Sequence, residues 1–220
     1  MYADLGPSPK KHTWGAVLLS KFPIINSTHH LLPSPHGELA PAIHAVLDIW
    51  GVPTHVVVSH NGQFEDKLDR ELQTKAIARI LSDAYPHPAI FLGYVVTKPH
   101  APRPEPYDIL FSDGLIFDVD PDDKDRWCQY LGFRGLERVG YARVSRYTVT
   151  DTELQTFKLA VPDRLEPNRD VRPFRVSGRH FKPAAWTYPL SLVRPGVRMN
   201  ETHKYSPYIY PQYFEFEARH

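Results

Sequence analysis

The sequence predicts an α+β fold, in which short strands and antiparallel hairpins are interspersed with helices. Three observations indicate this class. Apolar and β-branched runs are separated by turn signals, two pairs of these runs are close enough to form hairpins, and one segment has a strong helical period. A doubly wound parallel sheet would require strands that alternate regularly with helices.

The first strands are predicted from apolar runs. Trp14–Leu19 is followed by Pro23 and predicts a strand buried on both faces. Ile43–Trp50 alternates with the two-residue period of a strand that has two different faces. Because Gly51–Pro53 supplies a turn and His55–His60 is rich in β-branched residues, these two runs predict an antiparallel hairpin.

Residues 65–81 change to a helical period. The predicted buried face consists of Leu68, Leu72, Ala76 and Ile80, widened by Ile77 and Leu81. Acidic residues lie early in the segment and basic residues lie late, an order that stabilises a helix through its dipole.

Three shorter elements are predicted next. Pro88–Val96 is a candidate buried strand, and Lys98–Tyr107 has four prolines in ten residues, which predicts an extended loop. Asp108–Phe111 is a candidate short strand.

The acidic run at 118–125 permits two readings. A calcium loop counted from Asp118 would require glycine where Asp123 stands and glutamate where Gln129 stands. The pattern favours a helix instead, with Asp120 as N-cap, Pro121 in the first turn and Gly132 after its end. The predicted buried side of this helix is Trp127, Tyr130 and Leu131.

A second hairpin, formed by Tyr141–Val149 and Leu154–Val161, closes the predicted domain at residues 1–162. Residues 163–220 contain seven prolines and ten aromatic residues without a sustained period. This segment is too aromatic for a free linker, so we expect a C-terminal extension that packs on the domain.

Composition excludes several classes. The chain has 220 residues, with 26 Lys+Arg against 25 Asp+Glu and a net charge of +1, which argues against a broad nucleic-acid interface. The longest apolar run has eight residues, far fewer than the roughly 20 that cross a bilayer. The single cysteine, Cys128, permits no internal disulfide, and the N-terminus shows no signal peptide.

Two polar clusters follow predicted strands. The segment 26–41 contains His29, His30 and Glu38, which could bind an anion or a metal, supply acid–base groups, or face solvent. His60 and Asn61 lie between a buried strand and the helix. This is a frequent position for catalytic groups, but it also suits a histidine that is satisfied at a strand end.

A third cluster surrounds the predicted turn 150–153. Its Asp151 and Glu153 lie near Arg143, and these groups could handle a phosphate or form a surface salt-bridge set. Lys98 is a candidate phosphate contact or a solvated loop lysine. Asn26 and Asn200 begin glycosylation sequons, which are acceptors only in a secretory lumen.

The run Trp14–Ile24 resembles the G-x-x-L-S-[RK]-[FY]-P-I strand of the endonuclease/exonuclease/phosphatase superfamily, which has the DNase I-like fold. Residues 26–43, 91–99 and 150–155 are similar to the C-terminal soluble domain of the fungal calcofluor-white-hypersensitivity family. The proteins of that family are multi-span membrane proteins that exchange the diacylglycerol-type lipid of glycosylphosphatidylinositol (GPI) anchors for ceramide.

This resemblance implies a partial DNase I-like two-sheet β-sandwich flanked by helices. The first strand or strands would be missing, because the superfamily's metal-binding glutamate lies on a strand before Trp14. Two other motifs differ: the usual G-D-x-N is Gly93–Val96, and the usual S-D-H is Thr150–Thr152. We therefore expect a shortened chain that is inactive alone, within a parent that is active.

The resemblance implies a phosphodiesterase-like activity in GPI lipid remodelling. The catalytic residues implied are His60, Asn61, Glu38, His30 and Asp151, and the substrate-binding residues are His29, Arg143, Lys98 and Glu153. Magnesium is a possible cofactor by superfamily analogy alone. The implied partners are a GPI or phosphoinositide head group and an upstream membrane-spanning region, with no nucleic acid.

The implied location is the membrane of the endoplasmic reticulum, through the parent protein. An alternative function is a non-catalytic domain that presents the GPI head group to a membrane-embedded partner, favoured by the two altered motifs. A nuclease is a weaker alternative.

Overall fold

The computed structural model describes residues 2–7, 15–37, 40–144 and 152–162. The predicted extension at 163–220 lies outside these residues, so its packing and the domain boundary at 162 stay predictions. Within the described ranges, no helix combines the length and the apolar character needed to cross a membrane.

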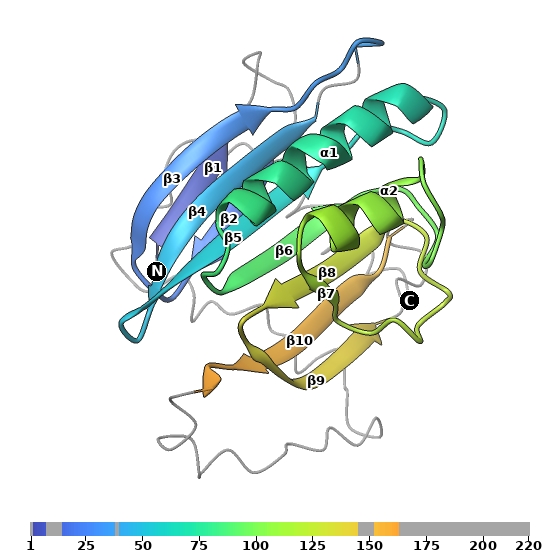
Figure 1. Cartoon of the computed structure of the whole chain (residues 1–220). Helices are drawn as coiled ribbons and strands as arrows, with labels where there is room; N and C mark the ends of the chain where they lie inside the picture. Colours follow the sequence, from blue (N-terminus) through green and yellow to red (C-terminus); the bar gives the residue numbers. More distant parts are fainter. Residues whose placement is uncertain (1, 8–14, 38–39, 145–151, 163–220) are drawn as a thin grey trace, which may run out of the picture. The chain divides into compact units, whose positions relative to one another are not determined.

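The centre of the fold is a six-stranded mixed sheet (Figure 1). Its order is β3-β4-β5-β6-β8-β7, and only the β5–β6 pair is parallel. The strands are β3 (Ile24–Leu31), β4 (Pro41–Ile49), β5 (Val52–His60), β6 (Ala89–Tyr94), β7 (Phe117–Asp118) and β8 (Gln129–Arg134). The predicted hairpin is confirmed as β4–β5, and the predicted strand at 88–96 is confirmed as β6.

A two-stranded sheet, β1 (Tyr2–Gly6) with β2 (Ala16–Ser20), covers one face of the large sheet. The prediction that the Trp14–Leu19 strand is buried on both faces is wrong, because Val17 and Leu19 are 53% and 58% exposed. Only one side of β2 packs inward, since β2 belongs to an outer layer. The strand β1 precedes this run and carries Asp4 rather than a glutamate.

Each face of the large sheet has its own core. Ile43, Ala45 and Val56 pack with Ala16 and Leu18 of β2. The opposite face packs against the helix α1 (Lys67–Asp83), and its core includes Ala42, Val57, Phe91, Ile77 and Leu81. Side chains alternate along a strand, so neighbours such as Ala42 and Ile43 serve the two cores.

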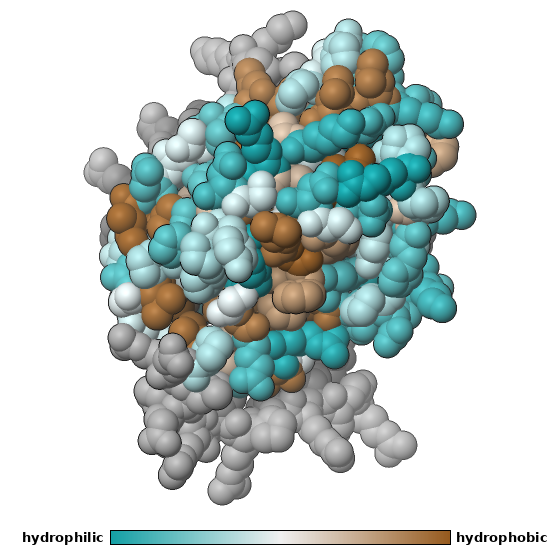
Figure 2. Space-filling view, viewed as in Figure 1, coloured by the Kyte–Doolittle hydropathy of each residue, from teal (hydrophilic) through white to brown (hydrophobic). Residues whose placement is uncertain are grey.

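The helix α1 is confirmed, but its predicted buried face is wrong in its first half. Leu68 is 43% exposed, whereas Arg70 and Gln73 are buried. The first half of α1 lies over the polar end of β5, where Gln73 accepts a hydrogen bond from the amide of Gly62. Figure 2 shows this side of the molecule, with hydrophobic patches between hydrophilic residues.

Two other predicted elements are wrong. Residues 108–111 form no strand, since they belong to the short helix α2 (Pro106–Asp108) and one π-helical turn, η1 (Ile109–Asp113). Residues 120–132 form no helix: turns lead into β8, in which Gly132 pairs with Phe91. Pairing of this segment with β6 in the sheet overrides the local preference for a helix that begins at an N-cap.

The second predicted hairpin is confirmed as β9 (Glu137–Val144) and β10 (Leu154–Ala160). The two strands pair antiparallel, with Leu154 opposite Val144. The predicted strand residues 145–149 lie outside the described ranges.

On the α1 side of the sheet, three histidines form a row across β4, β5 and the turn before β6. The Nε2 atom of His44 lies 2.8 Å from Nδ1 of His55. The ring of His55 stacks on His44 and on His87, with centroids 5.1 and 5.6 Å apart. Burial lowers the pKa of His44 to about 4, helped by the positive charges of His55 and His30. Burial also lowers the pKa of His55, together with the charges of His87 and Arg134.

This histidine row predicts acid-sensitive stability. A histidine in the unfolded chain has a pKa of about 6.5, so between pH 6.5 and about 4 the unfolded chain binds a proton at position 44 that the folded chain does not. The free energy of unfolding should therefore be fully present above pH 6.5 and fall as the pH is lowered through this window. Urea unfolding at successive pH values measures the slope, and His44→Gln should reduce it. The exposed variant His100→Gln is the control and should leave the slope unchanged. If His44→Gln has the same slope as this control, His44 is not the source of the acid sensitivity.

Candidate functional site

The candidate site lies at the edge of the large sheet that is formed by the ends of its strands, not along an outer strand. His60, the last residue of β5, pairs with Tyr94, the last residue of β6, and Tyr94 pairs with Gln129, the first residue of β8. On the other side, Pro41 begins β4 and pairs with Leu31 of β3. Directly paired residues share one face of a sheet, so the side chains of His60, Tyr94 and Gln129 belong to the same face.

His60 is held in a parallel stack on Tyr94. The ring centroids are 4.6 Å apart, and the ring planes differ by 1°. Burial lowers the pKa of His60 below its ordinary value, and this outweighs a hydrogen bond to its own backbone that acts in the opposite direction. The imidazole is therefore neutral at pH 7, which is the form that accepts a proton in general base catalysis.

Tyr94 stands where the superfamily motif has aspartate. Its ring makes an edge contact with Trp127 at 6.1 Å, and Trp127 is 40% exposed. The residue before it, Gly93, lies so close to Phe91 that a Cβ atom would be 2.4 Å from the ring. The edge consequently presents an aromatic surface around one neutral imidazole.

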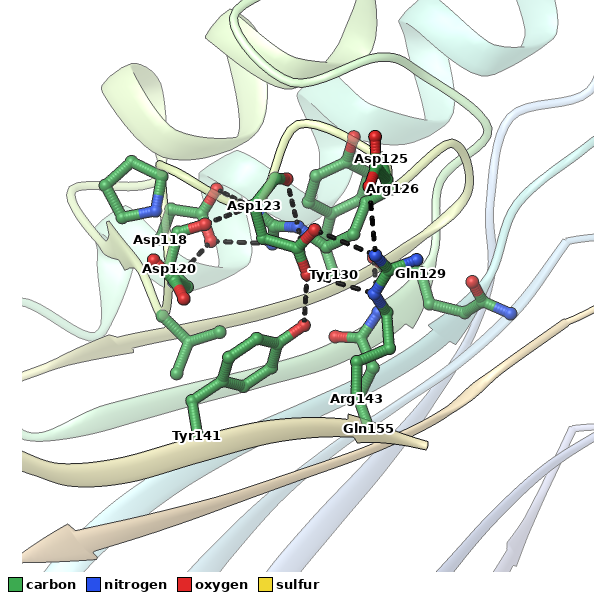
Figure 3. Close-up of polar contacts among 12 residues, drawn as sticks. Asp118, Asp120, Asp123, Asp125, Arg126, Gln129, Tyr130, Tyr141, Arg143 and Gln155 are labelled. Carbon is green, nitrogen blue, oxygen red and sulfur yellow. Dashed lines mark hydrogen bonds and ion pairs between the residues drawn. The ribbon is translucent and has the colours of Figure 1, made fainter. Parts of the chain in front are cut away.

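Two amide side chains follow Tyr94: Gln129, which pairs with Tyr94 in the sheet, and Gln155, which contacts Gln129, and both are labelled in Figure 3. Gln155 of β10 donates from Nε2 to the carbonyl of Gln129 at 3.0 Å. Among the described residues, Gln129 Nε2 and Gln155 Oε1 have no hydrogen-bond partner although both atoms are buried. An unpaired buried polar atom is costly, and neither of these two atoms is exposed to solvent.

Asn61 has a structural environment. It is fully buried, its Oδ1 accepts from Ser59, and its Nδ2 donates to Thr74 of α1, both at 3.2 Å. Its amide group is thus occupied in joining the end of β5 to the helix. Its predicted catalytic role stays a prediction that these contacts do not favour.

Asn61→Ala should lower the free energy of unfolding by about 1–3 kcal/mol, because it leaves the buried hydroxyl of Ser59 without its acceptor and removes the bond to Thr74, whose hydroxyl still donates to the carbonyl of Arg70. Chemical denaturation measures this loss. The exposed helix variant Lys75→Ala serves as control and should stay within about 0.5 kcal/mol of the parent. A fully stable Asn61→Ala protein would contradict a structural role.

The paired histidines lie on a strand, not on the predicted loop, because 24–31 forms β3. His29 is 2.7 Å from the carboxylate of Asp4, which also accepts a hydrogen bond from Ser27. Burial raises the pKa of Asp4, but the bonds from Ser27 and His29 prevail and lower it. His30 is partly buried, and its pKa is lowered by burial and then by the charge of His29.

Arg143 belongs to an ion-pair cluster, and Figure 3 shows it with Asp123 and Asp125. Arg143 pairs with Glu153 and, through Nε at 3.1 Å, with Asp123. Beneath it, Arg126 forms a two-pronged ion pair with Asp118 at 2.7 and 2.8 Å. Arg143 would have to give up carboxylate partners to bind a phosphate, so the geometry favours the salt-bridge reading of this cluster.

Lys98 is exposed, four residues after the end of β6, and its predicted contact with a phosphate stays a prediction. Glu38 and Asp151 lie outside the described residues, so their predicted meeting with His60 stays a prediction.

The described side chains do not fit a magnesium site at this edge. Mg²⁺ prefers carboxylate oxygens, whereas the phenol of Tyr94 is the group paired beside His60, and the next groups are the amides of Gln129 and Gln155. The structure contains no group of three histidine, cysteine or acidic residues suited to a metal within the described ranges.

Four residues of this region were not predicted as site residues from the sequence: Tyr94, Trp127, Gln129 and Gln155. The registers of β5, β6 and β8 place Tyr94 beside His60 and Gln129 beside Tyr94, and these registers depend on long-range pairing. No signal in the sequence indicated Tyr94 at a strand end, because the predicted strand at 88–96 extends two residues beyond it.

Comparison with known proteins gives a family and a fold. Residues 1–182 match the family model described as "PGAP2IP, C-terminal nuclease-like domain". Protein cwh43 of Schizosaccharomyces pombe is 56% identical over 197 residues, which are 90% of this chain and 19% of cwh43. The chain therefore spans about a fifth of that relative's length.

Among solved structures, the human nocturnin catalytic domain with bound sulfate has a TM-score of 0.53 and 15% identity, covering 71% of this chain and 72% of that domain. An endonuclease/exonuclease/phosphatase from Bacteroides vulgatus has a TM-score of 0.49 and 12% identity, covering 63% and 66%. At such identities the nocturnin likeness concerns the fold alone, and it confirms the predicted α+β, DNase I-like architecture.

Proposed function

The chain belongs to the family of PGAP2IP C-terminal nuclease-like domains, and from this premise we propose that it acts on the inositol-phosphate end of GPI anchors during lipid remodelling. The observation that carries the proposal is the neutral imidazole of His60, fixed at the edge of a DNase I-like sheet. Membrane association, at the endoplasmic reticulum, would come from the rest of a longer protein.

The proposed chemistry is exchange at a phosphodiester. The hydroxyl of an incoming ceramide attacks phosphorus, and His60 accepts the hydroxyl proton. The bond between phosphorus and the diacylglycerol oxygen breaks, and that oxygen leaves with the proton that the imidazolium returns. One imidazole therefore completes the proton balance, and no step requires a metal.

The head group would be held by neighbouring side chains. Once exposed by the binding of a ligand, Gln129 Nε2 and Gln155 Oε1 would suit the hydroxyls of inositol, and the exposed amine of Lys98 would suit the phosphate. The aromatic surface of Tyr94 and Trp127 excludes water from one side of the imidazole. Predicted contacts through Glu38, His30 and Asp151 would add further proton-transfer groups.

A second candidate is a non-catalytic domain that presents the head group to a membrane-embedded partner. It is favoured by Tyr94, which replaces the aspartate of the superfamily motif and covers one face of His60. A nuclease has weaker support, because the net charge of +1 offers little attraction for a polyanion.

Turnover separates the two candidates. The full-length protein in membranes is incubated with a fluorescent phosphatidylinositol and ceramide, and both head-group binding and formation of the ceramide phosphodiester are measured. The catalytic proposal predicts product that accumulates beyond one equivalent of protein. Saturable binding without product would instead establish the presenting role.

A further inference from the structure

The strand β3 carries a sequon in an exposed position. Asn26–Ser27–Thr28 satisfies the N-x-[ST] pattern, with no proline in the middle. Among the residues that the structure describes, the strand is at the edge of the six-stranded sheet and pairs only with β4. The outer side of an edge strand is open to a bulky group.

The acceptor amide and the hydroxyl two residues later share one side of the strand. Ser27 bonds to Asp4 of β1, so it faces the two-stranded sheet. Side chains alternate along a strand, so Asn26 and Thr28 belong to the opposite side, and both are exposed. The two groups that define a sequon are therefore presented together to solvent.

A glycan at Asn26 would not obstruct the candidate site. Leu31 of β3 lies opposite Pro41, at the edge that contains His60, and Asn26 is five residues away along the strand. At about 3.3 Å per residue this is roughly 16 Å. A sugar chain there would also shield the unpaired backbone of β3 from other strands.

The cysteine content suits the same compartment. The chain has one cysteine, Cys128, and its side chain is fully buried. A protein in an oxidising lumen has to pair its thiols or bury them, since exposed thiols form adventitious disulfides.

We propose that Asn26 is an N-glycosylation site and that this domain faces a secretory lumen. In the transfer, the amide nitrogen of Asn26 forms a bond to the anomeric carbon of a lipid-diphosphate-linked oligosaccharide. The nitrogen loses one proton, and the lipid diphosphate leaves. The site is independent of the phosphodiester chemistry, and it assigns the substrate of that chemistry to the lumenal leaflet.

The test is the electrophoretic mobility of the tagged protein, expressed in yeast from its complete gene, before and after endoglycosidase H. Asn200→Gln is present throughout, and every other sequon of the complete protein is removed in the same background, so that only Asn26 can be modified. Digestion should increase the mobility by the amount expected for the loss of one glycan. The variants Asn26→Gln and Thr28→Ala should abolish this shift, whereas Thr28→Ser should retain it.

Three outcomes are decisive. Equal mobility with and without the enzyme, or a shift that persists in Asn26→Gln, overturns the proposal. Should Asn26→Gln fail to accumulate, the comparison of Thr28→Ala with Thr28→Ser decides alone, because both retain Asn26. His60→Gln should keep the glycan whatever it does to activity, so failure of the proposed function would be seen separately.

Discussion

Replacing Arg126 with methionine is expected to lower the free energy of unfolding by about 3–5 kcal/mol. The guanidinium is fully buried and forms the two-pronged ion pair with Asp118, whose side chain is 4% exposed. It also lies over the ring of Tyr130, with 4.8 Å between the guanidinium carbon and the centroid. Methionine fills much of the volume, but it leaves the carboxylate of Asp118 buried without its cation.

The matched control is Arg103, which makes the same kind of contacts at the surface. It pairs with Asp108 and Asp113 at 2.7 and 2.6 Å, and its side chain is 48% exposed. Arg103→Met should therefore cost less than about 1 kcal/mol. Urea denaturation followed by tryptophan fluorescence measures both variants. Equal losses of unfolding free energy in the two variants would contradict the view that burial, rather than the number of ion pairs, determines how much Arg126 contributes to stability.

The acidic run around Arg126 also explains one failure of the sequence analysis. Asp120 and Pro121 have the local chemistry of a helix start, and nothing nearby in sequence argues against it. The structure uses the run differently: Asp118 and Asp123 bind arginines, and Tyr141 of β9 donates to Asp123. These partners lie up to 20 residues away, and a local pattern cannot show them.

The predicted buried face of α1 was wrong in its first half for a related reason. A helical period identifies apolar residues that share a side, and it assumes that the buried side is the apolar one. Here Arg70 is buried because it donates to the carbonyl of Val96 at 2.6 Å and pairs with Glu105. The second half of the helix, where Ile77 and Leu81 meet an apolar sheet, was predicted correctly.

Elements that depend on local signals were predictable. The β4–β5 hairpin follows from its alternation and its Gly51 turn, and His60 follows from its place at a strand end before a helix. The surroundings of His60 were not predictable, because the registers of three strands place Tyr94 beside it and Gln129 beside Tyr94.

His60→Gln is expected to lower the rate of phosphodiester exchange by at least about 100-fold, because glutamine has a similar shape but cannot accept the proton. The lowered pKa of His60 adds a pH signature. Activity of the parent should persist to pH values below 6.5 and fall only where the imidazole becomes protonated. Turnover of fluorescent phosphatidylinositol, measured from pH 5 to 8, tests both statements.

The control for this variant is His87→Gln, which changes an exposed histidine outside the candidate site. It should leave the exchange rate at pH 7 unchanged. His60→Gln should retain its affinity for the head group, since Gln129, Gln155 and Lys98 are intact. A parallel loss of affinity and rate would instead indicate that His60 serves binding.

The most direct test of a catalytic His60 is the lipid composition of GPI anchors in cells whose only copy of the gene carries His60→Gln. Mass spectrometry of released anchors gives the ratio of ceramide to diacylglycerol forms. The account predicts the composition of cells that lack the gene, with the variant protein present at normal abundance. Anchors with the ceramide content of unmodified cells would contradict it.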